Sequence, residues 1–347
     1  MTRRGRLLWS ILLAALVAGA LVAAVTLGQL PWGRLYPRLL RPLLTLTLAI
    51  GVGLFLGMVI EAAGLTARLG RLTMPLLRFG HLREPSALAC TAAFVSAISA
   101  STILMNAYRE QKISRQELTI SALILTFPTF FAHLPTMFFT ITPLLGALGI
   151  YYLAILLAGD VLRTLAYLSY GRLRLPRHPP AHPPAQTPAA AATPSLREIW
   201  METREKFLAR LHNILVITIP VYVAVFLAQE FGLFEALRHS LTSVLQGTQI
   251  PVQALGILLF SLAAETTGGY AAAGAILEAG ALSPAAVLLT LLLGTILASP
   301  MRAVRHQLPY YLGVFAPGLG LRLMVLSQVF RTLSLLPFLA LIYFFWL

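Results

Sequence analysis

The stretch Val161-Leu162-Arg163-Thr164-Leu165 occurs again, 168 residues later, as Val329-Phe330-Arg331-Thr332-Leu333. Two other stretches repeat at nearly the same spacing. Glu61-Ala62-Ala63-Gly64-Leu65 matches Gln229-Glu230-Phe231-Gly232-Leu233, and His133-Leu134-Pro135 matches Gln307-Leu308-Pro309. Similarity at a fixed period is the signature of a duplicated architecture. In membrane proteins, internal repeats are typical of transporters, whose sites lie where the two halves meet.

The composition excludes an ordinary soluble protein. Hydrophobic residues make up 58% of the chain and charged residues 11%, and the mean hydropathy is +0.81. A soluble domain carries about a quarter charged residues. Long apolar stretches occupy residues 7–30, 42–63, 86–107, 116–137, 144–169, 211–233, 252–277, 284–301 and 318–347. Because a crossing needs about 20 apolar residues, the sequence predicts an all-α polytopic membrane protein.

Composition shifts divide the chain into four parts. Residues 1–41 form an extra N-terminal transmembrane helix with its connection, since the apolar run is too long for a cleaved signal peptide. Residues 42–170 and 207–347 form the two repeats. The Pro- and Ala-rich segment 171–206 reads as a cytoplasmic linker, because its composition cannot build a packed core.

Basic residues indicate how the first repeat is threaded. The net charge is +14, but the arginines lie in short loops between apolar stretches, which favours the positive-inside rule over nucleic-acid binding. Loops 64–85 and 108–115 are both basic and both predicted to be cytoplasmic. Only the apolar segment 86–107 separates them. We therefore expect 86–107 to be a re-entrant hairpin, each limb reaching roughly 15 Å, half the hydrocarbon core.

The second repeat shows the opposite charge pattern. Loops 234–251 and 278–283 lack a basic excess, so they are predicted to be non-cytoplasmic, and 252–277 becomes a hairpin from the other side. Each repeat then has three crossings plus one hairpin, and an odd number of crossings makes the repeats inverted. Four full crossings per repeat would instead give a parallel repeat. The basic segment that contains Arg34, Arg38 and Arg41 disagrees with inversion, because inversion places it outside.

The middle of 252–277 carries the first candidate binding residues. Glu265 lies deep in an apolar segment, where carboxylates are costly and are functional candidates by default. Thr266 and Thr267 add hydroxyl groups, and Gly268 and Gly269 allow close backbone approach. The pattern predicts a substrate, cation or proton site at a hairpin tip. The alternative is a structural carboxylate paired with an arginine such as Arg302.

The matching part of the first repeat is a run of hydroxyl residues. The candidates that could hydrogen-bond a polar substrate are Ser96, Ser99, Ser101 and Thr102. Serines also promote close helix packing in membranes, and the sequence leaves both roles open.

Two residues near prolines are further cavity candidates. His133 lies between Pro128 and Pro135, and Arg302 follows Pro300. Prolines so placed can interrupt a helix and free carbonyl groups for a ligand. His133 is a proton relay, a ligand or a packing residue. Arg302 lines a cavity or anchors the topology.

The sequence also contains one charged pair, and it lacks several well-known motifs. Asp160 and Arg163 are three residues apart, as in a structural ion pair on one helix face, and in the second repeat Gln328 replaces the acid beside Arg331. Cys90 is the sole cysteine, which excludes an intramolecular disulfide. Motifs for nucleotide binding, zinc hydrolases or serine hydrolases are absent, so we expect no enzyme, no cofactor and no metal site.

The doubled unit with its loop and hairpin resembles the Gate, or nucleoside-recognition, family of bacterial membrane proteins. That family includes the membrane part of ferrous iron transporter B, sporulation maturation proteins and regions of concentrative nucleoside transporters. The resemblance rests on Pro75-Leu76-Leu77-Arg78-Phe79-Gly80 through Pro85-Ser86-Ala87, and on Ala264-Glu265-Thr266-Thr267-Gly268-Gly269. Related iron transporters have a cysteine after the Phe-Gly step, where this chain has His81, and this disfavours iron.

These observations predict a multi-pass protein of a bacterial or archaeal inner membrane that transports a small polar or ionic solute, either nucleoside-like or a cation. The two hairpin tips would meet near the midplane to form the site. The alternative is a non-transporting scaffold or accessory subunit of a larger membrane complex. The expected partners are the lipid bilayer, the solute, and a second copy or another membrane subunit.

Overall fold

The computed structural model describes residues 15–16, 18–27, 30–62, 77–177, 196–232, 251–263, 265–315 and 317–346. All regular elements within these ranges are helices. Six of them are long and apolar enough to cross a membrane: Gly33–Leu56, Arg115–Leu145, Ala147–Arg174, Lys206–Ala228, Pro284–Arg302 and Gly318–Phe345. The chain is therefore a polytopic helical membrane protein, and three of the six spans fall in each predicted repeat.

The two halves present their helices in the same order. The first contains α2 (Trp32–Leu35), η1 (Tyr36–Leu40), α3 (Arg41–Ala62), α6 (Glu84–Ala92), α7 (Ala97–Arg109), α8 (Arg115–Ile124), α9 (Thr126–Leu145) and α10 (Ala147–Arg174). The second contains α11 (Leu196–Glu230), α13 (Val252–Ala263), α14 (Glu265–Glu278), α15 (Pro284–Arg302), η2 (Ala303–Gln307), α16 (Leu308–Val314) and α17 (Pro317–Phe345). Each half thus has a long helix, two short helices, a broken helix and a final long helix.

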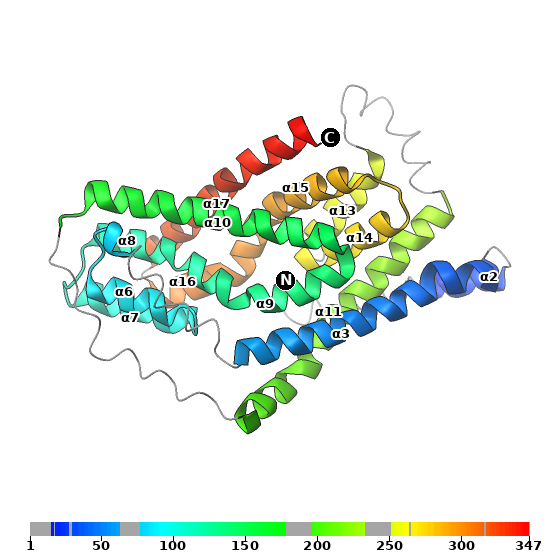
Figure 1. Cartoon of the computed structure of the whole chain (residues 1–347), viewed down its shortest axis with the longest axis horizontal. Helices are drawn as coiled ribbons and strands as arrows, with labels where there is room; N and C mark the ends of the chain where they lie inside the picture. Colours follow the sequence, from blue (N-terminus) through cyan, green and yellow to red (C-terminus); the bar gives the residue numbers. More distant parts are fainter. Residues whose placement is uncertain are drawn as a thin grey trace.

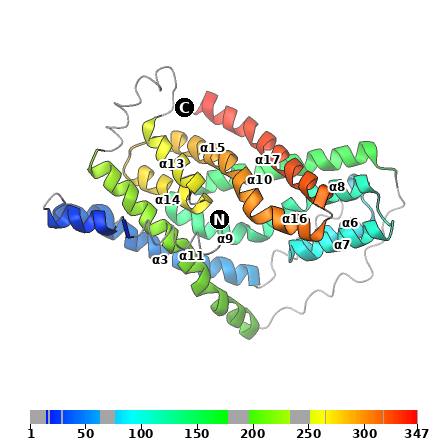
Figure 2. The same ribbon diagram turned by 180° about the vertical axis from the view of Figure 1, so that it is seen from behind.

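Corresponding helices of the two halves run in opposite directions. The helices α10 and α17 pack against each other and are antiparallel (Figure 1). The same reversal relates α3 to α11 and α9 to α15 (Figure 1). The short pairs α6–α7 and α13–α14 lie toward opposite ends of the molecule, as the reverse view also shows (Figure 2).

Both predicted hairpins are broken in the middle. The segment 86–107 turns at residues 93–96 between α6 and α7, and 252–277 is divided between α13, which ends at Ala263, and α14, which begins at Glu265. The start of α6 lies beside the end of α7, because the Arg83 guanidinium donates to the Lys112 carbonyl at 2.7 Å. Glu117 at the start of α8 also contacts the start of α6. Its buried carboxylate accepts hydrogen bonds from the Arg83 backbone N–H at 2.7 Å and from the Ser86 hydroxyl at 2.9 Å. The loops that flank the first hairpin therefore lie together.

The other end of the molecule holds the basic segment that disagreed with the topology. Arg38 in η1 pairs with Glu230 at the end of α11, with 2.9 Å between nitrogen and oxygen. The acidic partner does not remove the disagreement, because the positive-inside rule counts basic residues and not net charge.

Prolines have different effects in the two halves. The helix α9 continues through Pro135 and Pro143, and the break that precedes it is at Leu125, before Pro128. The possible interruption around His133 is thus not seen; proline within a membrane helix is tolerated where neighbouring groups satisfy the freed carbonyls. In the second half, the five-residue π-helix η2 interrupts the chain between Pro300 and Pro309. Such π-turns are frequent at functional sites.

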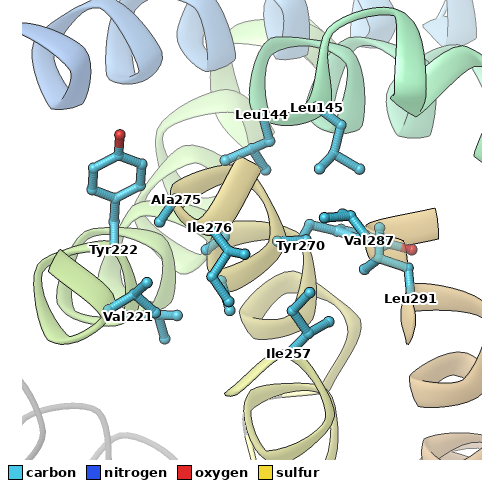
Figure 3. Close-up of a cluster of buried hydrophobic side chains, with 14 of the residues drawn as sticks. Leu144, Leu145, Val221, Tyr222, Ile257, Tyr270, Ala275, Ile276, Val287 and Leu291 are labelled. Carbon is cyan, nitrogen blue, oxygen red and sulfur yellow. The ribbon is translucent and has the colours of Figure 1, made fainter. Parts of the chain in front are cut away.

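The helix α14 lies at the centre of the larger apolar core. Its residues Tyr270, Ala275 and Ile276 project among side chains from α9, α11, α13 and α15 (Figure 3). Glycines bring the neighbours close: a Cβ at Gly274 would lie 2.6 Å from the Leu144 carbonyl oxygen of α9, and one at Gly269 would lie 2.1 Å from Ser261 Oγ of α13. This central helix therefore connects the second hairpin to the spans of both halves.

Candidate functional site

Polar side chains gather where α10, α14, α15 and α17 meet, and we call this group the polar cluster. Its members are Tyr152, Asp160, Arg163, Tyr270, Thr295, Ser299, Arg302, Gln328 and Arg331. All of them lie on helices that are otherwise strongly apolar. The helices α10 and α14 come from different halves, so the cluster lies between the two halves.

Three hydroxyl groups form one edge of the cluster. The hydroxyl of Tyr152 is 2.7 Å from Thr295 Oγ1 and 3.3 Å from the hydroxyl of Tyr270. The two tyrosine rings meet edge to face, with 5.5 Å between centroids. Three hydroxyl groups carry three protons, and two hydrogen bonds use only two of them. One O–H donor therefore remains for a further acceptor.

Charged groups form the middle of the cluster. Asp160 is fully buried and pairs with Arg163, whose side chain is 11% exposed. Arg331 on α17 lies close enough for the charges of Arg163 and Arg302 to act on it. Arg302, in turn, is within electrostatic reach of the Tyr270 hydroxyl. The charged groups and the hydroxyl groups are thus one continuous network.

Amide groups form the third part. The Ser299 hydroxyl donates to Gln328 Oε1 at 2.5 Å, and Gln328 Nε2 donates to Gln307 Oε1 at 2.9 Å. Gln328 precedes Arg331 by three residues on α17, as Asp160 precedes Arg163 on α10. The neutral amide therefore occupies the place where the first half has its carboxylate.

The cluster carries more positive than negative charge. Among the described side chains, three guanidinium groups lie near one carboxylate, and that carboxylate pairs with Arg163. Neither Arg302 nor Arg331 forms an ion pair with any described carboxylate. Nη2 of Arg302 is buried and has no hydrogen-bond partner among the described residues. The arrangement can attract and hold a negatively charged group.

The predicted hydroxyl residues of the first half lie elsewhere. Ser96 caps α7 by accepting from the Ser99 backbone N–H at 3.2 Å, and the two hydroxyls are 3.1 Å apart. Thr102 donates to the Ile98 carbonyl at 2.8 Å, and Ser101 is buried. Their helix packs on α6, α8 and α16, whereas α14 packs on α9, α11, α13 and α15. The two predicted tips therefore have different neighbours in this conformation.

The predicted residues of the second half open α14. Glu265 is its first residue, but the side chains of Glu265 and Thr266 fall outside the described part of the structure. Thr267 is half-buried, and Gly268 and Gly269 are buried. Gly269 serves the close approach of α13 that its sequence context predicted.

The two cavity candidates, Arg302 and His133, lie in different surroundings. Arg302 ends α15 and belongs to the polar cluster. His133 lies on α9 with an exposed side chain. The structure therefore brings Arg302 together with Asp160 and Arg163, which the sequence identified as a structural pair, and with Arg331, the residue that Gln328 leaves without a neighbouring acid.

A cleft of about 610 Å³ opens at the end of the molecule where α9 turns into α10. Arg41, Thr45, Tyr222 and Glu278 supply its polar lining, and the Tyr222 hydroxyl donates to the Glu278 carboxylate. Gly274 and Leu144 also line it. Glu278, Gly274 and Tyr270 follow one another at four-residue intervals on one face of α14. At a rise of 1.5 Å per residue, Gly274 lies about 6 Å and Glu278 about 12 Å along α14 from Tyr270.

Sequence reasoning missed the three hydrogen-bonded hydroxyl groups described above, which we call the hydroxyl trio. Tyr152, Tyr270 and Thr295 resemble ordinary residues of apolar helices, and 118 residues separate the two tyrosines. The available signal was indirect: buried tyrosine usually needs a partner for its hydroxyl.

Three uncharacterized proteins of the archaeon Methanocaldococcus jannaschii are similar to this chain. One is 25% identical over 282 residues, which is 81% of this chain and 88% of the relative. A second is 22% identical over 311 residues, covering 88% and 99%, and a third is 23% identical over 277 residues, covering 79% and 84%. No family model matches the chain, and no solved structure matches it. The similarity extends over most of each relative, both halves included.

Proposed function

We propose that this protein is a transporter of a small polar or ionic solute, with its site at the polar cluster between two inverted Gate-like halves. The polar cluster is the observation that carries the proposal. Ionisable groups within membrane spans are costly, and they mark solute or ion pathways in membrane proteins. Here they come from α10, α14, α15 and α17, so relative movement of the halves would change the site.

The opposite directions of corresponding helices support the inverted arrangement. In inverted-repeat transporters, the binding site lies near the midplane, where the repeats meet, and access alternates as one repeat rocks against the other. The short pairs α6–α7 and α13–α14 are suited to be the re-entrant elements, since each has two helices of 9 to 14 residues. The inner membrane is the expected location.

The cleft supports a route for the solute. It opens at one end of the molecule and shares α14 with the polar cluster. At the inner side of the cleft, α14 packs closely on α9 where Gly274 meets Leu144. We infer that the structure is open toward the cleft side and closed between the cleft and the cluster.

A transport assay with matched variants tests the proposal. Purified protein is screened for thermal stabilisation by nucleosides, amino acids, organic acids and inorganic ions, and stabilising solutes are tested for counterflow in proteoliposomes. Arg331→Gln is expected to abolish counterflow. Arg322→Gln, on the same helix but exposed, is the control and should keep it. Stable co-purification with another membrane protein, with no solute response, would instead support the scaffold.

A further inference from the structure

The excess positive charge of the polar cluster indicates which solute it suits. We propose that Arg302 and Arg331 bind an oxyanion, either a carboxylate or a phosphate, on the transported solute. This inference rests on the proposed transport function and narrows its solute class. The sequence-based expectation named a nucleoside-like solute or a cation, and the arginines favour a different chemistry.

The first argument concerns proton chemistry. A buried lysine or carboxylate can become neutral by losing or gaining a proton, but arginine stays charged in proteins. The positive charges of Arg302 and Arg331 therefore persist at any physiological pH. An isolated charge in an apolar interior costs several kcal/mol, so a compensating anion is strongly favoured.

The second argument concerns the carboxylates that could supply that compensation. Asp160 is the one described carboxylate of the polar cluster; it forms an ion pair with Arg163, and its charge also reaches Arg331 without forming an ion pair with it. The equivalent position beside Arg331 holds Gln328, whose two amide atoms are used by Ser299 and Gln307. In the described part of the chain, the second half therefore lacks the internal anion that the first half has. An anion from outside can take that place.

The third argument is geometric. A guanidinium presents parallel N–H donors that match the two oxygens of a carboxylate or phosphate. Nη2 of Arg302 is buried without a hydrogen-bond partner among the described residues. The spare O–H of the trio formed by Tyr152, Tyr270 and Thr295 adds a neutral donor near the same charges. These donors suit an oxyanion better than a cation or an apolar molecule.

The ligand screen uses wild-type protein, so it does not depend on any variant folding. Thermal stability in detergent is measured with sodium phosphate, sodium succinate and sodium chloride at equal ionic strength, and with uridine and choline chloride as neutral and cationic probes. Phosphate or succinate is expected to raise the melting temperature above the chloride value, while uridine and choline are not. Stabilisation by uridine or choline alone would overturn the proposal of an oxyanion, but it would still support the transport function. No binding and no counterflow of any probe would overturn the transport function itself.

A charge substitution at Gln328 tests the site. Gln328→Glu supplies the missing carboxylate, keeps the acceptor for Ser299, and should weaken phosphate or succinate binding by about tenfold or more. Arg322→Gln changes the net charge by the same amount at an exposed position of the same helix, outside the polar cluster; it is the matched control and should keep binding. Equal binding by Gln328→Glu and wild type would contradict the assignment.

The anionic group could also belong to a lipid, since a headgroup phosphate has the same chemistry. Delipidated protein is therefore tested with phosphatidylglycerol and with phosphatidylcholine. Stabilisation by phosphatidylglycerol, with no response to free phosphate or succinate, would show a structural lipid site and overturn a transported oxyanion.

Discussion

Arg163 and Arg331 occupy equivalent positions in the two halves of the chain, but Arg163 has Asp160 as its partner whereas Arg331 has Gln328 at the same place. Arg163 lies on α10 and Arg331 lies on α17, and these two helices pack antiparallel against each other (Figure 1). A carboxylate at position 328 would leave the three arginines of the polar cluster with one net positive charge. With Gln328 in that place, the described cluster has three guanidinium groups and one carboxylate, and we propose that this excess sets its preference for an anion.

Breaking the retained pair should destabilise the protein. Asp160→Asn leaves Arg163 without its carboxylate, and removal of one partner of a buried pair costs about 3–5 kcal/mol. Arg163→Gln should cost a similar amount. The double variant should lose less than the sum, because neither charge is then left alone. Unfolding in detergent measures all three; additive losses would contradict a direct pair.

The hydroxyl trio can be tested with two adjacent tyrosines. Tyr152→Phe removes the shared hydroxyl and leaves Thr295 and Tyr270 without it, at a cost of about 1–3 kcal/mol. Tyr151→Phe is the control, because Tyr151 is exposed and its ring contact with Trp346 survives the change. We expect a lower melting temperature and weaker solute binding for the first variant alone. Equal melting temperatures would argue against the trio.

Two glycines in spanning helices should respond oppositely to alanine. Gly274→Ala places a methyl group 2.6 Å from the Leu144 carbonyl oxygen and should destabilise by about 1–3 kcal/mol, because backbone must shift. Gly51→Ala in α3 meets nothing within 4 Å and should be neutral or stabilise by up to about 1 kcal/mol. Thermal unfolding distinguishes them. A neutral Gly274→Ala would mean that α9 and α14 are further apart.

Side-specific labelling tests the threading. In a Cys90→Ala background, single cysteines replace Lys112, between α7 and α8, and Ala279, after α14. Inverted halves predict labelling of the two cysteines by an impermeant reagent from opposite sides of the membrane. Leu173→Cys, at the end of α10, should be labelled from the same side of the membrane as Lys112→Cys. Labelling of Lys112→Cys and Ala279→Cys from the same side would rule out inversion.

The predictable features of the fold are those encoded locally. Apolar length predicted the spans, and the small polar runs predicted the division of each segment into two helices, α6 and α7 in one and α13 and α14 in the other, because such residues disfavour a continuous apolar helix. The sequence left open whether the helix breaks near Pro135, since proline alone does not decide whether a membrane helix continues.

The candidate site was less predictable because it depends on tertiary contacts. Asp160 and Arg163 are neighbours in sequence and were recognised as a pair, but nothing local indicates that Arg302 and Arg331 share their environment. The hydroxyl trio joins α10, α14 and α15, which only the folded chain brings together. Glu265 remains a prediction, because its side chain lies outside the described residues.

The contact of Gly274 with the Leu144 carbonyl has a mechanical consequence. The packing of α14 on α9 at this point involves main-chain atoms, so rotation of a side chain cannot loosen it. If the proposed solute passes between the cleft and the polar cluster here, α9 and α14 must separate as rigid rods, and collective helix movements of this kind take about microseconds to milliseconds. The conducting event would then be far slower than diffusion through an open pore, which gives the molecule the kinetics of a carrier and not of a channel.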